Sequence, residues 1–338
     1  MALSKIQVSS MADNTIHGRR NLIINGGMNL DERNSGSEVV PSSDDYTLDR
    51  FRYNASQASK LKVQQNAQAI TPPSGFSNYL GVTVNATHTV ASTDNFFLTY
   101  FVEGYDSAHL DFGKSTAKTV TLSFYVQSSL TGTFSGSIVN SAENRAYPYT
   151  YTINTADTWE RKTITIAGDT SGTWIGATNG KGLMLTFSLG MGSNFTGTAG
   201  QWNGSQDFGA TGETVKLVEN ASAQWKMTGL QLEVGSQATP FEHRSFGEEL
   251  SACQRYYWEF NASDDTSFIY ASATYGASNN RLTVQNPVTL RAKPSVSDNW
   301  NTGSPQLQHI GVNAFAYYSG SAFRMGTSGG YFKVDSEL

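Results

Sequence analysis

Aromatic side chains are the groups of this sequence whose type and spacing could bind a ligand. Tyr147, Tyr149 and Tyr151 occupy every second position of the segment YPYTY. On a β-strand such residues share one face at a repeat of about 6.8 Å, so their rings could stack on successive sugar rings. Ile153 continues the same phase, which favours a place in the core or in a subunit contact over a ligand site.

Two tryptophans complete the candidate glycan-binding residues. Trp174 lies in SGTWIG and Trp202 in GQWNGS. These polar, glycine-containing segments are typical of loops, where a ring is better placed to be exposed than on a strand. Loop tryptophans nevertheless more often close the end of a sandwich than hold a ligand. We predict glycan contacts for Trp174, Trp202, Tyr147, Tyr149 and Tyr151, with the core as the alternative.

Three aspartates could ligate calcium, which prefers clustered oxygen ligands. Asp44, Asp45 and Asp49 fall within six positions, but their spacing is not that of an EF-hand. Charged loop residues usually face water. We therefore predict no metal site and leave calcium at these three residues as an open alternative.

Catalytic machinery is not indicated by any motif. GTSGG at positions 326 to 330 resembles the nucleophile loop of serine proteases, with Thr327 in place of the usual aspartate. A triad also needs a histidine base and a buried acid, and none of the five histidines lies in a suitable context. The sequence has no zinc-binding Cys/His cluster and no phosphate-binding glycine loop before a helix. We expect no enzyme activity and no cofactor; a polysaccharide depolymerase whose two carboxylates lie far apart in the chain is the alternative.

The composition favours strands and turns over long helices. Of 338 residues, 15% are charged, 12% are aromatic and 32 are glycine, whereas the exposed faces of helices need many charged residues. A net charge of −5 gives no reason to expect nucleic acid or an anionic membrane as partner. No signal peptide and no membrane span is visible, so we expect synthesis in a cytoplasm. The single Cys253 is expected to be a buried apolar residue.

Strict alternation of apolar and polar residues predicts an antiparallel β-sandwich. The pattern is clearest in Lys118–Gln127, where the even-numbered residues Val120 to Val126 should face inward and the others outward. Further strands are expected at residues 78–84, 96–102, 161–166 and 182–190, and a first strand at 21–30, broken at Gly26. In residues 220–244 the apolar phase shifts at Gly229, which indicates a β-bulge in the last strand of the sandwich.

Three regions follow from this pattern: an aperiodic anchoring arm (1–20), the sandwich (21–244) and a small β-rich C-terminal domain (245–338). In the last region, a short helix should begin at Ser245 or Gly247, and strands are expected at 268–273, 281–285, 287–292 and 330–334. Its many tyrosines, tryptophans and phenylalanines exceed what so small a core should cover. We therefore predict a homo-oligomer, most plausibly a trimer, that is joined through this region, with packing on the sandwich of the same chain as the alternative.

Several segments, in order along nearly the whole chain, resemble phage tail-fibre and minor virion proteins. They are MALSKIQ, NLIINGGMN with YTLDRF, AKTVTLSFYV, DTWERKTITIAGDTSGTW, QLEVGSQATPFEHRS, ELSACQRYY and NPVTLRAKPSV. The resemblance implies a jelly roll like that of carbohydrate-binding modules, then a small β-rich region, in a virion component that is often trimeric. It does not fix the position on the virion. Because an aperiodic arm precedes a polar sandwich of low charge, we predict a tail fibre or short tail appendage that attaches to host-surface glycan, with the arm on other virion proteins. Capsid decoration is the alternative, and no catalytic motif is carried over.

Overall fold

The computed structural model describes residues 19–262, 269–271, 280–325 and 329–338. The described chain divides into two compact units, Met1–His243 and Arg244–Leu338. Most of the predicted arm and Gly326–Ser328 of the protease-like motif lie outside the described residues. In the described part, no helix is long and apolar enough to cross a membrane.

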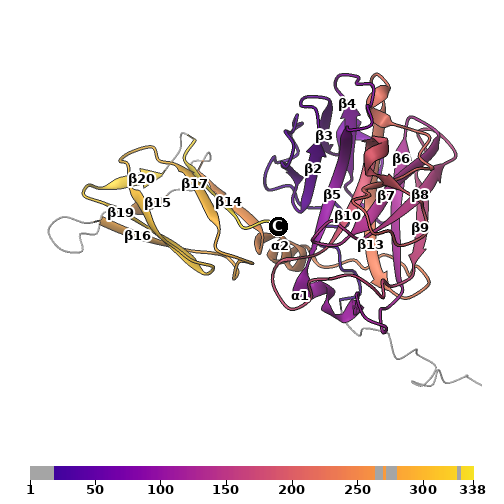
Figure 1. Cartoon of the computed structure of the whole chain (residues 1–338). Helices are drawn as coiled ribbons and strands as arrows, with labels where there is room; N and C mark the ends of the chain where they lie inside the picture. Colours follow the sequence, from indigo (N-terminus) through magenta and orange to yellow (C-terminus); the bar gives the residue numbers. More distant parts are fainter. Residues whose placement is uncertain (1–18, 263–268, 272–279, 326–328) are drawn as a thin grey trace, which may run out of the picture. The chain divides into compact units, whose positions relative to one another are not determined.

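The first unit is an antiparallel jelly-roll β-sandwich, as predicted (Figure 1). One sheet has six strands, in the order β1 (Tyr46–Leu48), β2 (Phe51–Ala55), β5 (Asn95–Glu103), β10 (Lys181–Met191), β7 (Gly132–Val139) and β8 (Ala146–Ile153). The other has five, in the order β3 (Leu61–Gln65), β4 (Leu80–Val84), β13 (Gln224–Val234), β6 (Val120–Ser128) and β9 (Glu160–Ile166).

The core of the sandwich lies between the two sheets and follows the predicted alternation. On β6, Val120, Leu122, Phe124 and Val126 are fully buried. The outward side of this strand is less open than expected, because Thr121, Ser123 and Gln127 are buried as well. Neighbouring backbone covers part of this side, since the Thr121 hydroxyl donates to the carbonyl of Gly235 at 2.8 Å.

The predicted bulge is present on β13, the central strand of the five-stranded sheet. The pairing of β13 with β6 shifts register between Thr228 and Gln231, and Gly229 has a φ of +64°, which favours glycine. Trp225 and Leu230, on either side of the bulge, are both fully buried. The bulge therefore keeps both halves of the strand in the core despite the break in phase.

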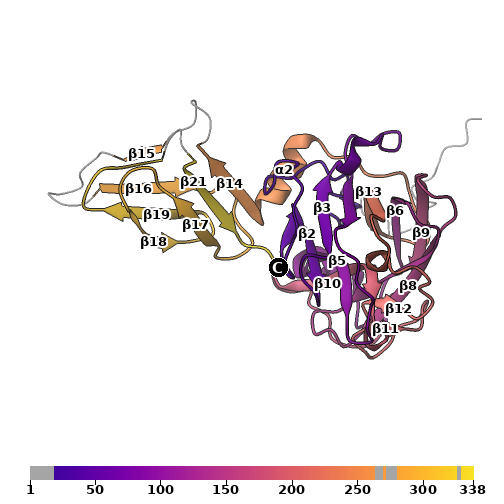
Figure 2. The same cartoon turned by 90° about the horizontal axis from the view of Figure 1, so that it is seen from above.

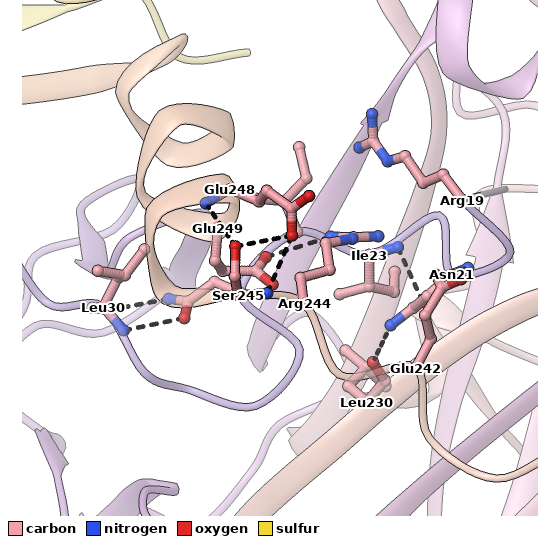
Figure 3. A network of polar contacts seen from close by, with 12 residues as sticks. Arg19, Asn21, Ile23, Leu30, Leu230, Glu242, Arg244, Ser245, Glu248 and Glu249 are labelled. Carbon is pink, nitrogen blue, oxygen red and sulfur yellow. Dashed lines mark hydrogen bonds and ion pairs between the residues drawn. The ribbon is translucent and has the colours of Figure 1, made fainter.

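The segment 21–30, predicted as a strand, is irregular in the structure. Its hydrogen bonds go to the bulged part of β13: Leu230 N–H donates to the Gly26 carbonyl at 2.9 Å, and the side chain of Asn21 donates to the Leu230 carbonyl at 3.0 Å. Glu242 accepts from the backbone N–H of Arg20 and Asn21 at 3.0 and 2.9 Å (Figure 3). The segment thus bonds to β13 and to side chains in place of a regular strand ladder.

Short elements connect the strands of the sandwich. In residues 19–243 they are helix α1 (Gly104–Ser107), the 3₁₀ turns Ala67–Ala69, Ala108–Leu110, Ser193–Phe195 and Leu217–Glu219, and a parallel pair of β11 (Thr196–Gly197) and β12 (Gly209–Ala210). In the connection between β10 and β13, β12 lies against β7 and β8; Figure 2 shows β11 and β12 next to β8.

The second unit is β-rich and begins with the predicted short helix, α2 (Phe246–Gln254). Ser245 caps it in a reciprocal capping box with Glu248 (Figure 3). Cys253 is buried on it, as expected. The described strands of this unit form three small sheets (Figure 2). The first has β14 (Tyr257–Asn261), β21 (Tyr331–Asp335) and β17 (Ser295–Asn299), the second β15 (Ile269–Ala271) and β20 (Phe323–Met325), and the third β16 (Asn280–Gln285), β19 (Ala314–Ser319) and β18 (Gln306–Ile310).

Two expectations for this unit were wrong. Residues 287–292 form no strand, because Leu290 N–H and Arg291 N–H donate to Val312 and Arg255, in separate segments. The aromatic side chains do have a core of their own, which contains Trp258, Phe315, Tyr317, Phe323 and Phe332. These rings are therefore not excess apolar surface, and they give no reason to expect an oligomer interface.

Candidate functional site

Four aromatic rings pack together against the sandwich core. Three of them belong to residues predicted to contact a glycan, and the fourth is that of Phe112. Trp202 lies 5.2 Å from Tyr147 and 5.5 Å from Trp174 between ring centroids. Phe112 lies 5.0 Å from Trp174 and 5.7 Å from Trp202. All four contacts are edge-to-face, the geometry that aromatic pairs prefer. The structure thus brings together three residues that the sequence singled out separately: Tyr147, Trp174 and Trp202.

The loop that carries Trp174 is fixed by a buried carboxylate. Asp169 accepts from Arg145 Nη2 and Nε at 2.6 and 2.9 Å, from Ser171 N–H at 3.0 Å and from Trp174 Nε1 at 3.2 Å. Its side chain is 2% exposed, and the carboxylate raises the pKa of Arg145 through this hydrogen bond. Gly113 N–H also donates to the Asp169 carbonyl at 2.7 Å. Trp174 therefore has one fixed position before any ligand arrives.

Trp202 is anchored in the same way. Its Nε1 donates to the carbonyl of Ala167 at 2.7 Å, at the start of the same loop. Both tryptophans are half-buried and pack against the core, whereas Tyr147 is 8% exposed. The tryptophans are thus more exposed than the tyrosine, as expected, but they do not stand free in solvent.

A pocket of about 300 Å³ opens beside Trp174, at the lower end of the range for small-ligand sites. We call it the tryptophan pocket. Its apolar wall is made by Trp174, Phe112, Leu110 and Ile175, and its polar groups include Ser107, Asp111 and Lys114. Asp111 accepts from the Lys114 ammonium at 2.8 Å and from Thr116. The pocket combines a fixed ring with hydroxyl and charged groups.

The other two candidate tyrosines lie in the core. Tyr149 and Tyr151 are 2% and 5% exposed; the Tyr149 hydroxyl donates to the Thr186 carbonyl at 2.7 Å, and Trp225 Nε1 donates to the Tyr151 hydroxyl at 3.1 Å. Burial raises the pKa of both phenols. In this structure neither ring presents a face to a ligand, which agrees with the core alternative stated for this strand.

The three aspartates considered for calcium serve separate roles. Asp49 is 1% exposed and lies 3.5 Å from Arg33, Asp44 pairs with Arg52, and Asp45 accepts from Ser42 N–H at 2.7 Å. Among the residues that the structure describes, no three His, Cys, Asp or Glu side chains gather in a way that could hold a metal ion.

One serine, histidine and aspartate do lie together, but not as a triad. His88 Nε2 lies 2.8 Å from Asp94, and its hydrogen bond lowers the pKa of that carboxyl. The hydroxyl of Ser56 donates to Asp94 at 2.8 Å. In a triad the hydroxyl would bond to the imidazole that removes its proton, so this arrangement does not activate Ser56.

A second and larger hollow, of about 470 Å³, lies on the outer side of the six-stranded sheet. We call it the charged groove. Phe97, Phe101, Met184 and Phe208 form its buried floor; its polar lining includes Ser43, Asp44, Arg52, Asn54, Asn95, Glu143, Lys181 and Gln206. Phe97 and Phe208 stack at 4.9 Å, which ties the connection after β10 to β5.

The sequence did not point to this groove, since its residues come from β2, β5, β10 and three connections. One pattern in the sequence could have indicated it. Phe97 and Phe101 lie on the face of β5 opposite to Leu98 and Tyr100, so large apolar side chains on both faces predict that other residues cover the outer face as well.

No family model matches the chain, and no curated protein matches it. Several solved structures are similar in fold. A putative sugar binding protein from Bacteroides thetaiotaomicron is 13% identical over 64% of this chain and all of that one, with a TM-score of 0.36. TmCBM61, solved with β-1,4-galactotriose, is 10% identical over 64% and 99%, with a TM-score of 0.33.

A third similar structure is the enzymatically active domain of tailspike protein 4 of bacteriophage CBA120. It is 9% identical over 64% of this chain, with a TM-score of 0.33, and the chain spans 21% of its length. At these identities and TM-scores the likeness does not extend to a site or an activity.

Proposed function

We propose that this chain is a glycan-binding protein whose ligand lies in the tryptophan pocket. The observation that carries the proposal is the half-buried ring of Trp174, fixed by Asp169 and packed on Phe112 and Trp202 beside an open pocket. A ring that is already immobile loses little conformational entropy when a sugar stacks on it, so more of the contact energy appears as affinity. Ser107, Asp111 and Lys114 supply hydrogen-bonding groups for sugar hydroxyls.

Binding of the full-length chain to a glycan array, followed by calorimetry on the best ligand, tests this proposal. We expect Trp174→Ala to weaken binding by roughly tenfold or more, as for the loss of a central aromatic contact. Trp159→Ala is the matched control, because Trp159 is also half-buried on the sandwich, with its Nε1 bonded to the Thr71 carbonyl at 3.0 Å, and it does not line the pocket. Equal affinities for both variants, with both folded, would refute the site.

The biological setting we propose is a phage virion, with the chain as a tail fibre or short tail appendage that attaches to host-surface glycan. Its support is the ordered set of segments that resemble such proteins. Immunogold labelling of purified particles should mark the tail, and absence of the protein from particles would contradict the proposal. Capsid decoration is the alternative, which a high copy number on the head would favour.

We propose binding without cleavage, and a homo-oligomer. After incubation with host polysaccharide, the chain-length distribution should be unchanged; shortened chains would show a depolymerase. The oligomer that we propose is a trimer. Its only support is the resemblance to virion proteins, because the aromatic rings of the second unit fill that unit's own core and leave no apolar surface as an argument for an interface. Light scattering that reports a monomer would exclude it.

A further inference from the structure

The ammonium group of Lys181 has no acceptor in the charged groove. Lys181 begins β10 and is half-buried. Its Nζ lies 4.4 Å from the centre of the Phe101 ring. Among the described residues, no side chain forms an ion pair or a hydrogen bond with this ammonium, and the charges that act on it are those of Arg52 and Glu143. A half-buried cation usually has such a partner, since removing a charge from water is costly.

A second cation lies close to Lys181. The guanidinium of Arg52 is over the same Phe101 ring, at 5.5 Å. Its Nη2 pairs with Asp44, while its Nε is buried without a hydrogen-bond partner. Burial lowers the pKa of both Arg52 and Lys181, and the charge of Arg52 lowers that of Lys181 further. The charge of Glu143 acts on both cations, but no acceptor is hydrogen-bonded to the Lys181 ammonium, and an anion placed there would stabilise the two like charges.

The groove also contains two carboxylates, and neither occupies this position. Asp44 is 63% exposed and is used by Arg52 and by the side chain of Asn54, at 2.7 Å. Glu143 accepts from Gln206 Nε2 at 2.5 Å, and its charge partly opposes the lowering of the pKa of Lys181 and of Arg52 by burial. The negative charge of Glu143 should repel an anionic ligand, so removing that charge should increase the affinity for such a ligand.

We propose that the charged groove binds an acidic glycan, with the carboxylate of a uronic-acid-type sugar on Lys181. The inference rests on the proposed function only in taking the ligand to be a glycan, and it concerns a site other than the tryptophan pocket. A ring-borne carboxylate suits this place because the ammonium lies directly at the floor of the groove, within reach of a group attached to the sugar ring itself.

The rest of the lining favours a glycan over an acidic peptide. Of the apolar side chains of the groove, Phe97, Phe101, Met184 and Phe208 are buried, whereas Ala55 and Phe195 are half-buried, so the groove offers limited apolar contact to a peptide side chain. The accessible groups include hydroxyl and amide side chains, namely Ser43, Asn54, Asn95 and Gln206. Such groups exchange hydrogen bonds with sugar hydroxyls.

The test measures affinity of the full-length chain for oligosaccharides of galacturonate, alginate and hyaluronan, each beside its carboxyl-reduced neutral form. We expect at least one acidic form to bind roughly tenfold or more tightly than its reduced form. Lys181→Gln should remove that difference, since a charge-assisted hydrogen bond is worth about one to two powers of ten in affinity. Glu143→Gln should strengthen binding of the acidic form, and added salt should weaken it.

Two controls separate this inference from the proposed function. Lys62→Gln, a lysine already paired with Glu38 at 2.8 Å, should leave acidic binding unchanged, and Trp174→Ala should lower neutral-glycan binding while the preference for the acidic form persists. Equal binding of acidic and reduced forms, or of a polyglutamate peptide and the acidic glycan, would overturn the acidic-glycan site alone. Absence of binding to every glycan would overturn both proposals.

Discussion

Replacing Asp169 by asparagine should loosen the loop that carries Trp174. Asparagine keeps the shape and one acceptor oxygen, but it removes the charge and turns an NH₂ group toward one nitrogen of Arg145. The native carboxylate accepts two hydrogen bonds from Arg145, one from Ser171 N–H and one from Trp174. Each hydrogen bond to a charged group contributes about 1.5–3 kcal/mol.

The loss of unfolding free energy in Asp169→Asn depends on how well water can replace the broken hydrogen bonds. Asp169 is 2% exposed and cannot be reached by water, whereas Arg145 is 21% exposed and is partly rehydrated. We therefore expect a loss of about 2–3 kcal/mol, below the roughly 3–5 kcal/mol typical of a broken, fully buried ion pair. For a domain the size of the sandwich, this corresponds to a fall in Tm of about 4–12 °C.

Scanning calorimetry of the full-length chain measures this fall, and Asp45→Asn is the control. Asp45 is exposed and accepts a hydrogen bond from Ser42 N–H, so its replacement should change the unfolding free energy by no more than about 0.5 kcal/mol. The Asp169 variant should also show red-shifted tryptophan fluorescence as Trp174 gains solvent. A variant as stable as Asp45→Asn would refute the role given to this carboxylate.

Two further changes follow from the contacts of the sandwich. Gly26→Ala should destabilise it by about 1–3 kcal/mol, because a Cβ there would lie 2.2 Å from the Leu230 carbonyl oxygen; Gly204→Ala, with nothing within 4 Å, should be nearly neutral in the same urea titration. Burial raises the pKa of Glu213 from 4.5 to about 7, so the folded chain binds more protons than the unfolded chain in that window, and stability should fall as the pH rises through it. Urea midpoints at pH 5 and pH 8 should show the fall in the native protein and not in Glu213→Gln; a native midpoint that rises would contradict the assigned pKa.

Local patterns in the sequence predicted the parts of the fold that local geometry decides. The alternation in β6, β9 and β10 and the phase break at Gly229 each depend on residues two positions apart, which the printed sequence shows directly. The helix cap at Ser245 is equally local. Residues 21–30 contain apolar residues like those of a strand, but they form backbone hydrogen bonds with β13, some 200 positions later. The periodicity of a short segment cannot predict a partner so distant in the sequence.

The candidate sites divide in the same way. The sequence pointed to Trp174 and Trp202 because tryptophan in a polar loop is conspicuous, yet Phe112, which joins them, and Asp169, which holds the loop, have no local signature. Lys181 and Arg52 lie about 130 positions apart and meet only because β2, β5 and β10 are neighbours in one sheet. Their common ring, Phe101, is an ordinary strand residue in the sequence.

The position of β13 also bears on how the protein is made. This strand is the last of the sandwich to leave the ribosome, yet it lies between β4 and β6 at the centre of its sheet (Figure 1). About 140 residues separate the end of β4 from the start of β13, which at 5–20 residues per second is a delay of roughly 7–28 s. β4 lacks its β13 partner during that interval, and β6 lacks it from the time that residue 128 is made; unpaired edges are where chains associate wrongly. Newly made chains thus depend on protection from one another until residue 234 has emerged.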